Sequence, residues 1–217
     1  MFRAFLEDLR AVRTHDPAAT NQLETLLCHV PLHALIIHRV AHALHTRLHV
    51  PILPRLLSAM ARFWTGVEIH PGARIGRRCF IDHGTAVVIG ETTEIGDDCV
   101  LFHNVTLGGT GKLRGKRHPT IENNVFLGTG ATLLGPITVG SNAKIGANAF
   151  VHMHDVPPNC TATGTPARIV KRNGQRVDEE LPRTRISERS IPTPISNEAS
   201  APATPDSSTR SSSGSRS

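Results

Sequence analysis

Residues 121–151 read IENNVFLGTGATLLGPITVGSNAKIGANAFV, and every sixth residue of this stretch is aliphatic. The residues at these positions are Ile121, Leu127, Leu133, Val139, Ile145 and Val151. Since Ile, Leu and Val together occupy roughly one position in four, six consecutive matches have odds of about one in four thousand. A period of six is neither the period of two of a half-exposed strand nor the 3.6 of a helix. The stretch therefore predicts a repeat architecture.

The same period continues toward the N-terminus. Aliphatic residues recur at Ile69, Ile75, Ile81 and Val87 and, after a slip of two residues, at Ile89, Ile95, Leu101 and Leu107. Gly often follows the aliphatic residue, and the fourth position after it is often small or thin: Ala73, Cys79, Thr85, Thr93, Cys99, Ala131, Ala143 and Ala149. In a parallel β-helix each short strand points one aliphatic side chain inward, and each coil covers the apolar face of its neighbour. Residues 66–170 are therefore predicted to form a parallel β-helix that buries Cys79 and Cys99 as small hydrophobes.

The chain before the repeat, residues 1–65, has a pattern that predicts helices. Asp16 followed by Pro17 is typical of a helix start, and this helix is expected to run through Leu27. Apolar residues at steps of three and four predict a second helix over 32–48, and prolines open a third segment over 51–64. Histidines spaced by four can hold a metal, but no nearby Cys or acidic residue completes a ligand shell. We therefore expect packing and surface roles for His29, His33, His38, His42, His45 and His49.

The composition excludes several classes of protein. The 217 residues carry a net charge of +6, but only 4% are aromatic, so no stacking platform accompanies the basic residues. This argues against nucleic-acid binding and permits attraction of a small polyanion. No run of about 18 or more apolar residues exists, and Glu7 and Asp8 stand where a signal peptide is apolar. We expect a cytoplasmic chain that spans no membrane, with its four cysteines as free thiols.

The end of the chain loses the repeat. Its last residues read PTPISNEASAPATPDSSTRSSSGSRS, which is rich in Ser, Thr, Pro and Ala and nearly free of aliphatic residues. Such a segment cannot bury enough apolar surface to offset the entropy of ordering it. We therefore expect two domains, a helical one over 1–65 and a β-helix over 66–170, followed by a disordered tail over 171–217.

Departures from the repeat indicate where chemistry can occur. Asp82 and His83 occupy positions where the repeat elsewhere prefers Gly and then a residue without a reactive side chain. Glu91 comes just after the slip of two residues in the period. An imidazole titrates near neutral pH and is suited to act as a general base. Glu68 would lie close to His83, one coil earlier, if three hexapeptides make one turn of the helix. A carboxylate there can orient the ring and stabilise its protonated form.

The segment GGTGKLRGKRHP, residues 108–119, interrupts the repeat as a loop. Its glycines leave backbone N–H groups accessible to an anion or an oxyanion. Arg117 and His118 near its end can reach a neighbouring subunit, where the forked guanidinium can bind a carboxylate. Taken together with His83, these residues predict a catalytic β-helix rather than a bare scaffold.

These segments closely resemble the serine acetyltransferases, enzymes that make O-acetylserine for cysteine biosynthesis. The resemblance covers about residues 14–172. It rests on segments in family order and spacing: DPAA (16–19), FIDHGTAVVIGET (80–92), VTLGGTG (105–111), KRHPTI (116–121) and GTPARIV (164–170).

The resemblance implies a left-handed parallel β-helix with an α-helical N-terminal domain that drives association, and active sites between adjacent β-helices. The implied reaction transfers the acetyl group of acetyl-CoA to the hydroxyl of L-serine, giving O-acetyl-L-serine and CoA. The implied partners are L-serine, acetyl-CoA as co-substrate, L-cysteine as feedback inhibitor, and copies of the chain in a homotrimer or a dimer of trimers. No metal, nucleic acid or membrane is implied.

The resemblance also assigns roles to residues. The position matching the family's general base is His83, and its carboxylate partner maps to Glu68. Positions that hold serine or the inhibiting cysteine map to Asp16, Asp82, Arg117 and His118. Positions that line the acetyl-CoA channel map to Gly109, Thr110, Gly128, Thr129 and Gly130. Because Cys79 and Cys99 are assigned to the core, we expect direct transfer without a covalent acetyl-enzyme.

The chain departs from well-known members of the family in three places. They have Asp where this chain has Glu68, which keeps the charge and moves it by one methylene. The helical domain is shorter, which leaves a single trimer and a dimer of trimers both open. Many members end in an aliphatic residue that enters the active site of O-acetylserine sulfhydrylase. This chain ends in Arg216 and Ser217, so we expect no such complex through its C-terminus.

Three other functions are possible for a hexapeptide β-helix. Another hexapeptide acetyltransferase, acting on homoserine or a sugar, is disfavoured by the combination of IDH, RHP and DPAA. A hydrolyase of the γ-carbonic-anhydrase type needs three His on neighbouring coils, two of them closely spaced, and the coil histidines lack that pair. A purely structural β-helix would leave the polar side chains at 82, 83, 91 and 117 without a role.

Overall fold

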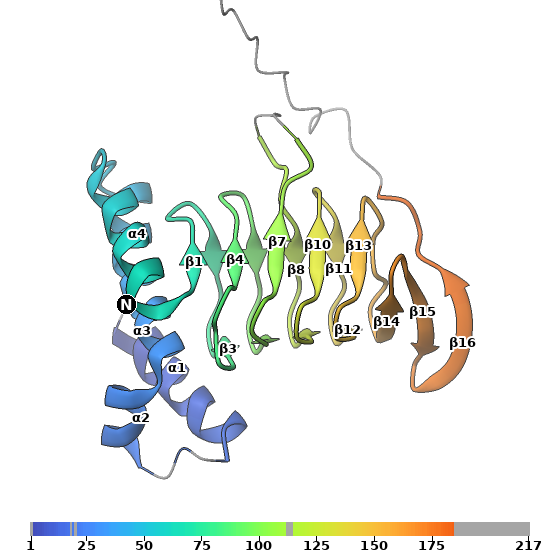
Figure 1. Cartoon of the computed structure of the whole chain (residues 1–217), viewed down its shortest axis with the longest axis horizontal. Helices are drawn as coiled ribbons and strands as arrows, with labels where there is room; N and C mark the ends of the chain where they lie inside the picture. The colour runs from blue at the N-terminus through green and yellow to red at the C-terminus, as the bar shows by residue number, and fades with distance from the viewer. Residues whose placement is uncertain (1, 18, 20, 112–114, 185–217) are drawn as a thin grey trace, which may run out of the picture.

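The computed structural model describes residues 2–17, 19, 21–111 and 115–184. Its N-terminal part consists of four helices: α1 (Phe2–His15), α2 (Gln22–Cys28), α3 (Val30–Thr46) and α4 (Leu53–Thr65). Figure 1 shows these helices at one end of an elongated stack of short strands. None of the described helices is by itself long and apolar enough to cross a membrane. Only α2 and α3 taken together, with a bend of 74° between them, meet that requirement by length and composition.

The start of α2 differs from the sequence prediction. The Asp16 N–H donates to the carbonyl oxygen of Val12 (2.8 Å), so Asp16 closes the last turn of α1 and does not begin a new helix. The cap of α2 is Asn21, whose Oδ1 accepts a hydrogen bond from the N–H of Glu24 (2.7 Å). The predicted helix start at Asp16 and Pro17 is therefore wrong, because a second capping side chain five residues later satisfies the helix terminus.

The strands that follow, except the last three, are two or three residues long. They are β1 (Glu68–Ile69), β2 (Arg74–Ile75), β3 (Phe80–Ile81), β4 (Val88–Ile89), β5 (Glu94–Ile95), β6 (Val100–Leu101), β7 (Thr106–Gly108), β8 (Thr120–Ile121), β9 (Phe126–Leu127), β10 (Thr132–Leu134), β11 (Thr138–Val139), β12 (Lys144–Ile145), β13 (Phe150–His152), β14 (Cys160–Gly164), β15 (Ala167–Arg172) and β16 (Gln175–Glu180).

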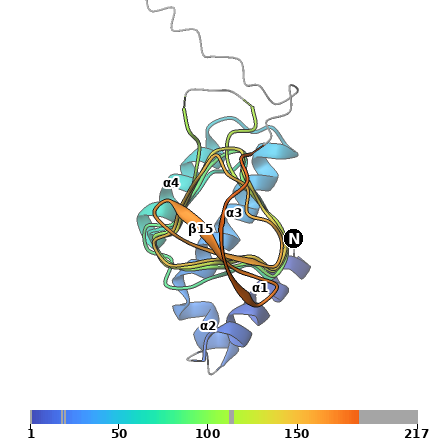
Figure 2. The ribbon, with the colours of Figure 1, turned by 90° about the vertical axis from the view of Figure 1, so that its right-hand side faces the viewer.

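Each strand up to β10 pairs in parallel with the third strand after it, whereas β12 pairs in parallel with β14, and three sheets result. They run in the orders β1-β4-β7-β10-β13, β2-β5-β8-β11 and β3-β6-β9-β12-β14. Figure 2, a view along the stack, shows the coils superposed in a roughly triangular outline. This is the left-handed parallel β-helix behind N-terminal helices that the sequence predicted, and the prediction of the fold is confirmed.

The core of the β-helix is the column of residues that the period of six selects. The side chains of Leu101, Leu127 and Val139 are wholly buried, and so are the predicted interior cysteines, Cys79 and Cys99. The coils differ in length because turns differ. Glu68 pairs with Val88, twenty positions on, and Val88 with Thr106, eighteen positions on, so the turn after β3 holds two extra residues.

Those two residues explain one exception to the repeat. Thr85 occupies a position that the period of six assigns to the interior, yet its side chain is exposed. Val87 fills the interior place instead and is wholly buried. The slip seen in the sequence is thus an insertion at one corner, and it leaves the core column continuous.

The C-terminal end of the coil is more ordered than predicted. After β14 the chain reverses, and β15 and β16 add antiparallel strands to the third sheet. Ile169 is wholly buried under this hairpin, and Arg172 pairs with Glu179 (2.5 Å). The predicted start of a disordered tail at 171 is therefore wrong for residues 171–184, because antiparallel pairing needs no hexapeptide pattern. The rest of the predicted tail, 185–217, lies outside the described residues.

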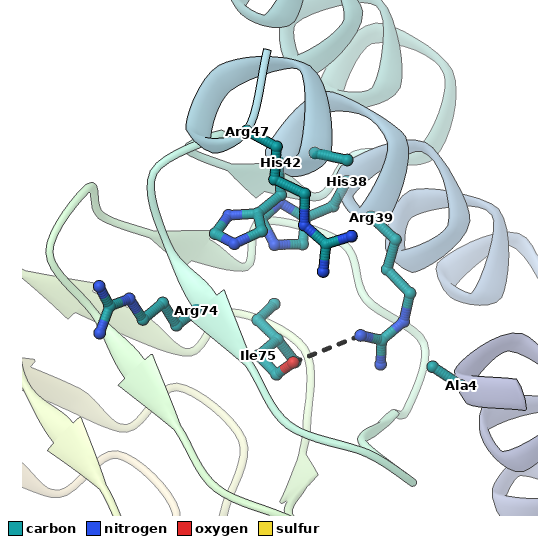
Figure 3. A pocket seen from close by; sticks show the side chains of 8 residues that line it. Ala4, His38, Arg39, His42, Arg47, Arg74 and Ile75 are labelled. Atoms are coloured by element: carbon teal, nitrogen blue, oxygen red, sulfur yellow. Dashed lines mark hydrogen bonds between the residues drawn. The ribbon is translucent and has the colours of Figure 1, made fainter. Parts of the chain in front are cut away.

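A buried ion pair joins the helices to the first coil. The Arg39 guanidinium of α3 donates to both carboxylate oxygens of Asp8 in α1 (2.8 and 3.1 Å). It also donates to the carbonyl oxygens of Ile75 (3.3 Å) and Gly76 (2.8 Å). Figure 3 shows the cavity at this joint, with Arg39 reaching Ile75 across it. The joint fixes the helices against the β-helix, and so fixes where the segment after α1 lies.

Candidate active site

The predicted general base, His83, lies on the long turn between β3 and β4, at a corner of the β-helix. It adopts the left-handed backbone conformation (φ 59°), and Gly84 follows with φ 72°. Hydrogen bonds hold this turn: the Gly84 N–H donates to the Asp82 carbonyl (2.7 Å) and the Thr85 N–H to the His83 carbonyl (3.0 Å). The insertion thus displays His83 outside the coil, where its side chain is 73% exposed. We call Asp82, His83, His103 and Gly128–Gly130, which stack here, the His83 corner.

Two side chains approach the His83 ring. Asp82 Oδ1 lies 3.9 Å from His83 Nε2. The ring of His103, from the next coil, meets His83 edge to face with the two centroids 5.7 Å apart. His103 Nδ1 is buried and has no hydrogen-bond partner among the described residues. His103 was not among the predicted site residues, although it stands twenty positions after His83, as Val100 stands after its partner Phe80.

Glu68, the predicted orienting carboxylate, begins β1. Its Oε2 forms an ion pair with the Arg62 guanidinium of α4 (2.8 Å); the Arg62 side chain is exposed and the Glu68 side chain is half-buried. The carboxylate recorded beside the His83 ring is that of Asp82. An orienting role for Glu68 therefore stays a prediction, and it would require Glu68 to exchange Arg62 for the imidazole.

The segment between α1 and α2 brings Asp16 toward the His83 corner. The rings of His15 and His29 both contact Phe80 of β3, with centroid distances of 5.4 and 5.7 Å. Asp16 follows His15 directly, and Asp82 comes two residues after Phe80. Both carboxylates stabilise the protonated form of the His29 ring, although burial is the larger effect and lowers the pKa of His29 overall. Two of the predicted substrate-binding residues, Asp16 and Asp82, thus both act on the charge of the same ring.

The other two lie at a second corner, between β4 and β5. The Arg117 guanidinium pairs with the carboxylate of Glu91. Thr92 Oγ1 accepts hydrogen bonds from the backbone N–H groups of Arg117 (3.0 Å) and His118 (3.1 Å). Thr92 therefore anchors the end of the long loop on the coil below it. We call Glu91, Thr92, Arg117 and His118 the Arg117 corner; Thr92 was missed from the sequence, since an ordinary Thr gives no signal.

The His118 imidazole is held in one orientation. Its Nδ1 receives the Thr92 backbone N–H (3.2 Å) and lies 2.9 Å from Thr92 Oγ1. Burial lowers the pKa of His118 to about 4, the positive charge of Arg117 contributes to the fall, and Glu91 opposes it. The ring is therefore neutral near neutral pH, with Nε2–H as a donor that has no partner in the described part of the chain. A neutral donor beside a guanidinium is suited to a carboxylate ligand.

The residues predicted to line the acetyl-CoA channel divide between the two corners. Gly109 lies beside the Arg117 and His118 side chains. Gly130 lies at the His83 corner, where its N–H donates to the carbonyl of His103 (3.1 Å). Gly130 has φ 70°, and a Cβ atom there would lie 2.2 Å from Asn148 Oδ1, so only glycine fits. Residues 112–114 of the long loop lie outside the described residues.

The two corners flank one sheet of the same chain. The sheet β1-β4-β7-β10-β13 begins at the His83 corner and ends at the Arg117 corner, since β4 separates His83 from Glu91. Figure 1 shows this sheet in front, with the β7–β8 loop projecting above it. The described part of one chain therefore offers an exposed imidazole with carboxylates at one corner and a cationic group with a neutral imidazole at the other. In the same part of the chain, no three His, Cys, Asp or Glu side chains are arranged to hold a metal ion.

Comparison with known families supports the reading of the repeat. The model "Bacterial transferase hexapeptide (six repeats)" matches residues 118–152, and "Hexapeptide repeat of succinyl-transferase" matches residues 72–108. The serine acetyltransferase of Synechococcus elongatus is 54% identical over 178 residues, which cover 82% of this chain and 72% of that protein. The serine acetyltransferase of Helicobacter pylori is 56% identical over 165 residues, 76% of this chain and 95% of that protein.

Solved structures of serine acetyltransferases have folds similar to that of this chain. The Neisseria gonorrhoeae serine acetyltransferase in complex with serine superposes with a TM-score of 0.73 at 39% identity, covering 78% of this chain and 69% of that one. The Brucella abortus enzyme in complex with coenzyme A gives 0.75 at 38% identity, covering 82% and 69%. A serine acetyltransferase in complex with cysteine gives 0.74 at 40% identity, covering 78% and 65%. The chain spans about two thirds of the length of these solved chains.

Proposed function

This chain belongs to the serine acetyltransferase family, and from that premise we propose that His83 is the general base of its acetyl transfer. As a member of the family, the chain is an acetyl-CoA-dependent acyltransferase that acetylates serine in cysteine biosynthesis. The observation that carries the proposal is the insertion between β3 and β4. It presents one imidazole to solvent in a left-handed turn, with a carboxylate 3.9 Å from its ring.

The reaction is a direct transfer between the two bound substrates. The His83 ring takes the proton of the serine hydroxyl as the oxygen attacks the thioester carbonyl carbon of acetyl-CoA. When the tetrahedral intermediate collapses, the carbon–sulfur bond breaks, and the leaving thiolate takes the proton from the imidazolium. A covalent acetyl-enzyme on cysteine is disfavoured, because burial raises the pKa of the Cys79 thiol and raises that of Cys99 to about 11.

The amino acid is held by opposite charges at its two ends. Asp16 and Asp82 receive the ammonium group, and Arg117 and His118 receive the carboxylate. L-Cysteine carries the same two groups, so it occupies the same place as an inhibitor. Solved relatives in complex with serine and with cysteine support both ligands for this chain.

Two copies of the chain form each site, because one serine is too small to span from the His83 corner to the Arg117 corner across a sheet. A homotrimer brings the His83 corner of one copy to the Arg117 corner of the next. The exposed apolar side chains of α4 support such an association: Leu56, Met60, Phe63 and Trp64. Whether two trimers then pair is a separate property of the helices.

Acetyl-CoA lies in the channel between the same two copies. Gly109 and Thr110 line it from one copy, and Gly128, Thr129 and Gly130 line it from the other. Glycines at these turns allow the backbone N–H groups to approach the thioester and the pantetheine arm closely. A relative solved with coenzyme A supports this ligand.

Thiol release from acetyl-CoA tests the proposal. The purified chain is assayed with L-serine, with homoserine, with a galactoside and without acceptor. His83→Asn is compared with His49→Asn, an exposed histidine that has the same left-handed backbone (φ 49°) and lies outside the site. We expect serine-dependent release that falls by ~10²–10⁴ in His83→Asn only. Release with another acceptor alone would assign the fold to a different hexapeptide acetyltransferase.

A further inference from the structure

We propose that His29 is a positioning residue of the subsite that receives the amino group of serine, where it controls the charge that Asp16 and Asp82 present. The inference rests on the proposed function and deepens it, since these two carboxylates are the ones assigned to the ammonium group. His29 was expected from the sequence to be an ordinary packing histidine.

The position of His29 is fixed by two helices at once. Its backbone N–H donates to the carbonyl of Thr25 and so ends α2 (3.1 Å), while its Nδ1 accepts the N–H of Leu32 and so caps α3 (3.3 Å). Because Nδ1 is an acceptor, the proton of the neutral ring resides on Nε2. The ring therefore has one defined tautomer, and its Nε2–H has no hydrogen-bond partner among the residues that the structure describes.

The surroundings of His29 come from several elements. Its ring contacts Phe80 of β3, the strand that leads to Asp82, and the same Phe80 stacks with His15, the residue before Asp16. A cavity beside the ring is lined by Asp16, Glu24, Thr25 and Cys28. The groups that act on its charge are Asp16 and Asp82, which attract a proton to the ring, and His33 of α3, which repels one.

The balance of these effects leaves His29 neutral near neutral pH. Burial is the largest effect and lowers the pKa of His29 in spite of both carboxylates. The two carboxylates then keep their negative charge for an ammonium ion. When the ring takes a proton at lower pH, the imidazolium competes with that ammonium for the same two carboxylates. By linkage, bound serine must in turn lower the pKa of His29 further.

A capping role and a charge role can be separated, because Asn is a strong helix N-cap and does not titrate. In His29→Asn the N-terminus of α3 keeps an acceptor, so the fold and thermal unfolding temperature should change little. The part of the pH dependence of serine binding that comes from protonation of His29 should be lost. His49→Asn is the matched control, since it removes an exposed histidine far from this cavity.

The experiment measures the dissociation constant of L-serine by calorimetry at about pH 7.5 and about pH 5.5, on either side of the ordinary imidazole pKa. Because His83 is a second imidazole beside Asp82, each protein is measured with and without His83→Asn. Because burial holds the pKa of His29 below its ordinary value, only part of the rings are protonated at the lower pH, and we expect binding to the unsubstituted chain to weaken there by less than about tenfold. We expect most of this dependence to vanish in His29→Asn and to persist in His49→Asn.

Two outcomes overturn the inference while leaving the proposed function intact. One is a pH dependence of full size in His29→Asn. The other is an equal loss of serine binding at both pH values in that variant, which a purely structural cap would produce. Thiol release by the unsubstituted chain is measured on the same samples. If it shows no dependence on serine, the proposed function fails, and the role of His29 falls with it.

Discussion

At the scale of single residues, the His118 ring of the Arg117 corner packs directly against the backbone of Gly90. A Cβ atom at Gly90 would lie 2.0 Å from Cδ2 of the His118 ring, far inside van der Waals contact. The glycine therefore allows the ring to lie against the coil, where Thr92 holds it. The proposed carboxylate subsite thus depends on the lack of a side chain at Gly90 as well as on Arg117 and His118, which bind the ligand.

Gly90→Ala should displace the His118 ring and weaken serine binding. We expect the KM for serine to rise by about tenfold, equivalent to ~1.4 kcal/mol of lost binding free energy. Steady-state kinetics check this, and Gly111→Ala serves as the control for thermal unfolding, since a Cβ atom there would meet nothing within 4 Å. A Gly90→Ala enzyme with unchanged KM would mean that His118 does not hold the carboxylate.

At the scale of elements, a ladder of asparagines stabilises another corner of the coil. Asn124, Asn142 and Asn159 all adopt left-handed backbone conformations. Their side chains bond in sequence: Asn124 Nδ2 donates to Asn142 Oδ1 (2.8 Å), and Asn142 Nδ2 donates to Asn159 Oδ1 (3.0 Å). Asn tolerates this conformation better than other residues with a Cβ atom, so the type of residue and its place in the turn agree.

Two substitutions at Asn142 distinguish the contribution of its backbone conformation to stability from the contribution of its side-chain hydrogen bonds. Asn142→Ala loses both hydrogen bonds and keeps a Cβ atom in the left-handed conformation without the amide group that lets Asn tolerate it, and this strain costs up to about 1–2 kcal/mol. Asn142→Gly loses the same hydrogen bonds without that strain, so we expect it to be the more stable variant. Urea unfolding at equilibrium measures both, and equal losses in the two variants would show that the backbone conformation is not what Asn142 provides.

At the scale of the whole molecule, the separation of the two corners is the reason for the proposal that copies of the chain share each site. If each site takes His83 from one copy and Arg117 from the next, a chain with His83→Asn and a chain with Arg117→Ala are defective at different halves of the site. Each should be inactive alone. Random trimers formed from equal amounts of both contain intact pairs at about a quarter of their interfaces.

Each mixed trimer contains one intact interface of three, so mixed trimers purified after co-expression of the two variants should recover about a third of the activity of the unsubstituted chain. Purification through a different tag on each chain ensures that only mixed oligomers are assayed, and light scattering gives their mass. The double variant, His83→Asn with Arg117→Ala on the same chain, mixed with unsubstituted chains gives a matched control. Mixed oligomers without activity would place the whole site within one chain.

The sequence by itself determined the repeat, because each rung of a β-helix needs one aliphatic side chain at a fixed period. Local spacing was also enough to make His83 a candidate, since the insertion that exposes it appears as a slip of two residues in the pattern. The loop that carries Arg117 and His118 is visible in the same way, as an interruption of the pattern. These features depend on neighbours along the chain, which a sequence shows directly.

Only the tertiary structure decided which distant residues meet. His103 contacts His83, and Thr92 anchors His118, because stacked coils bring together residues that are one coil apart in the sequence. The number of residues in a coil varies with its turns and loops. The pairing of Glu68 with Arg62, the place of His29 and the order of β15 and β16 depend on how the helices and the terminal hairpin dock. Docking is set by burial and by hydrogen bonds across elements, such as those of Arg39, and no local pattern in the sequence records them.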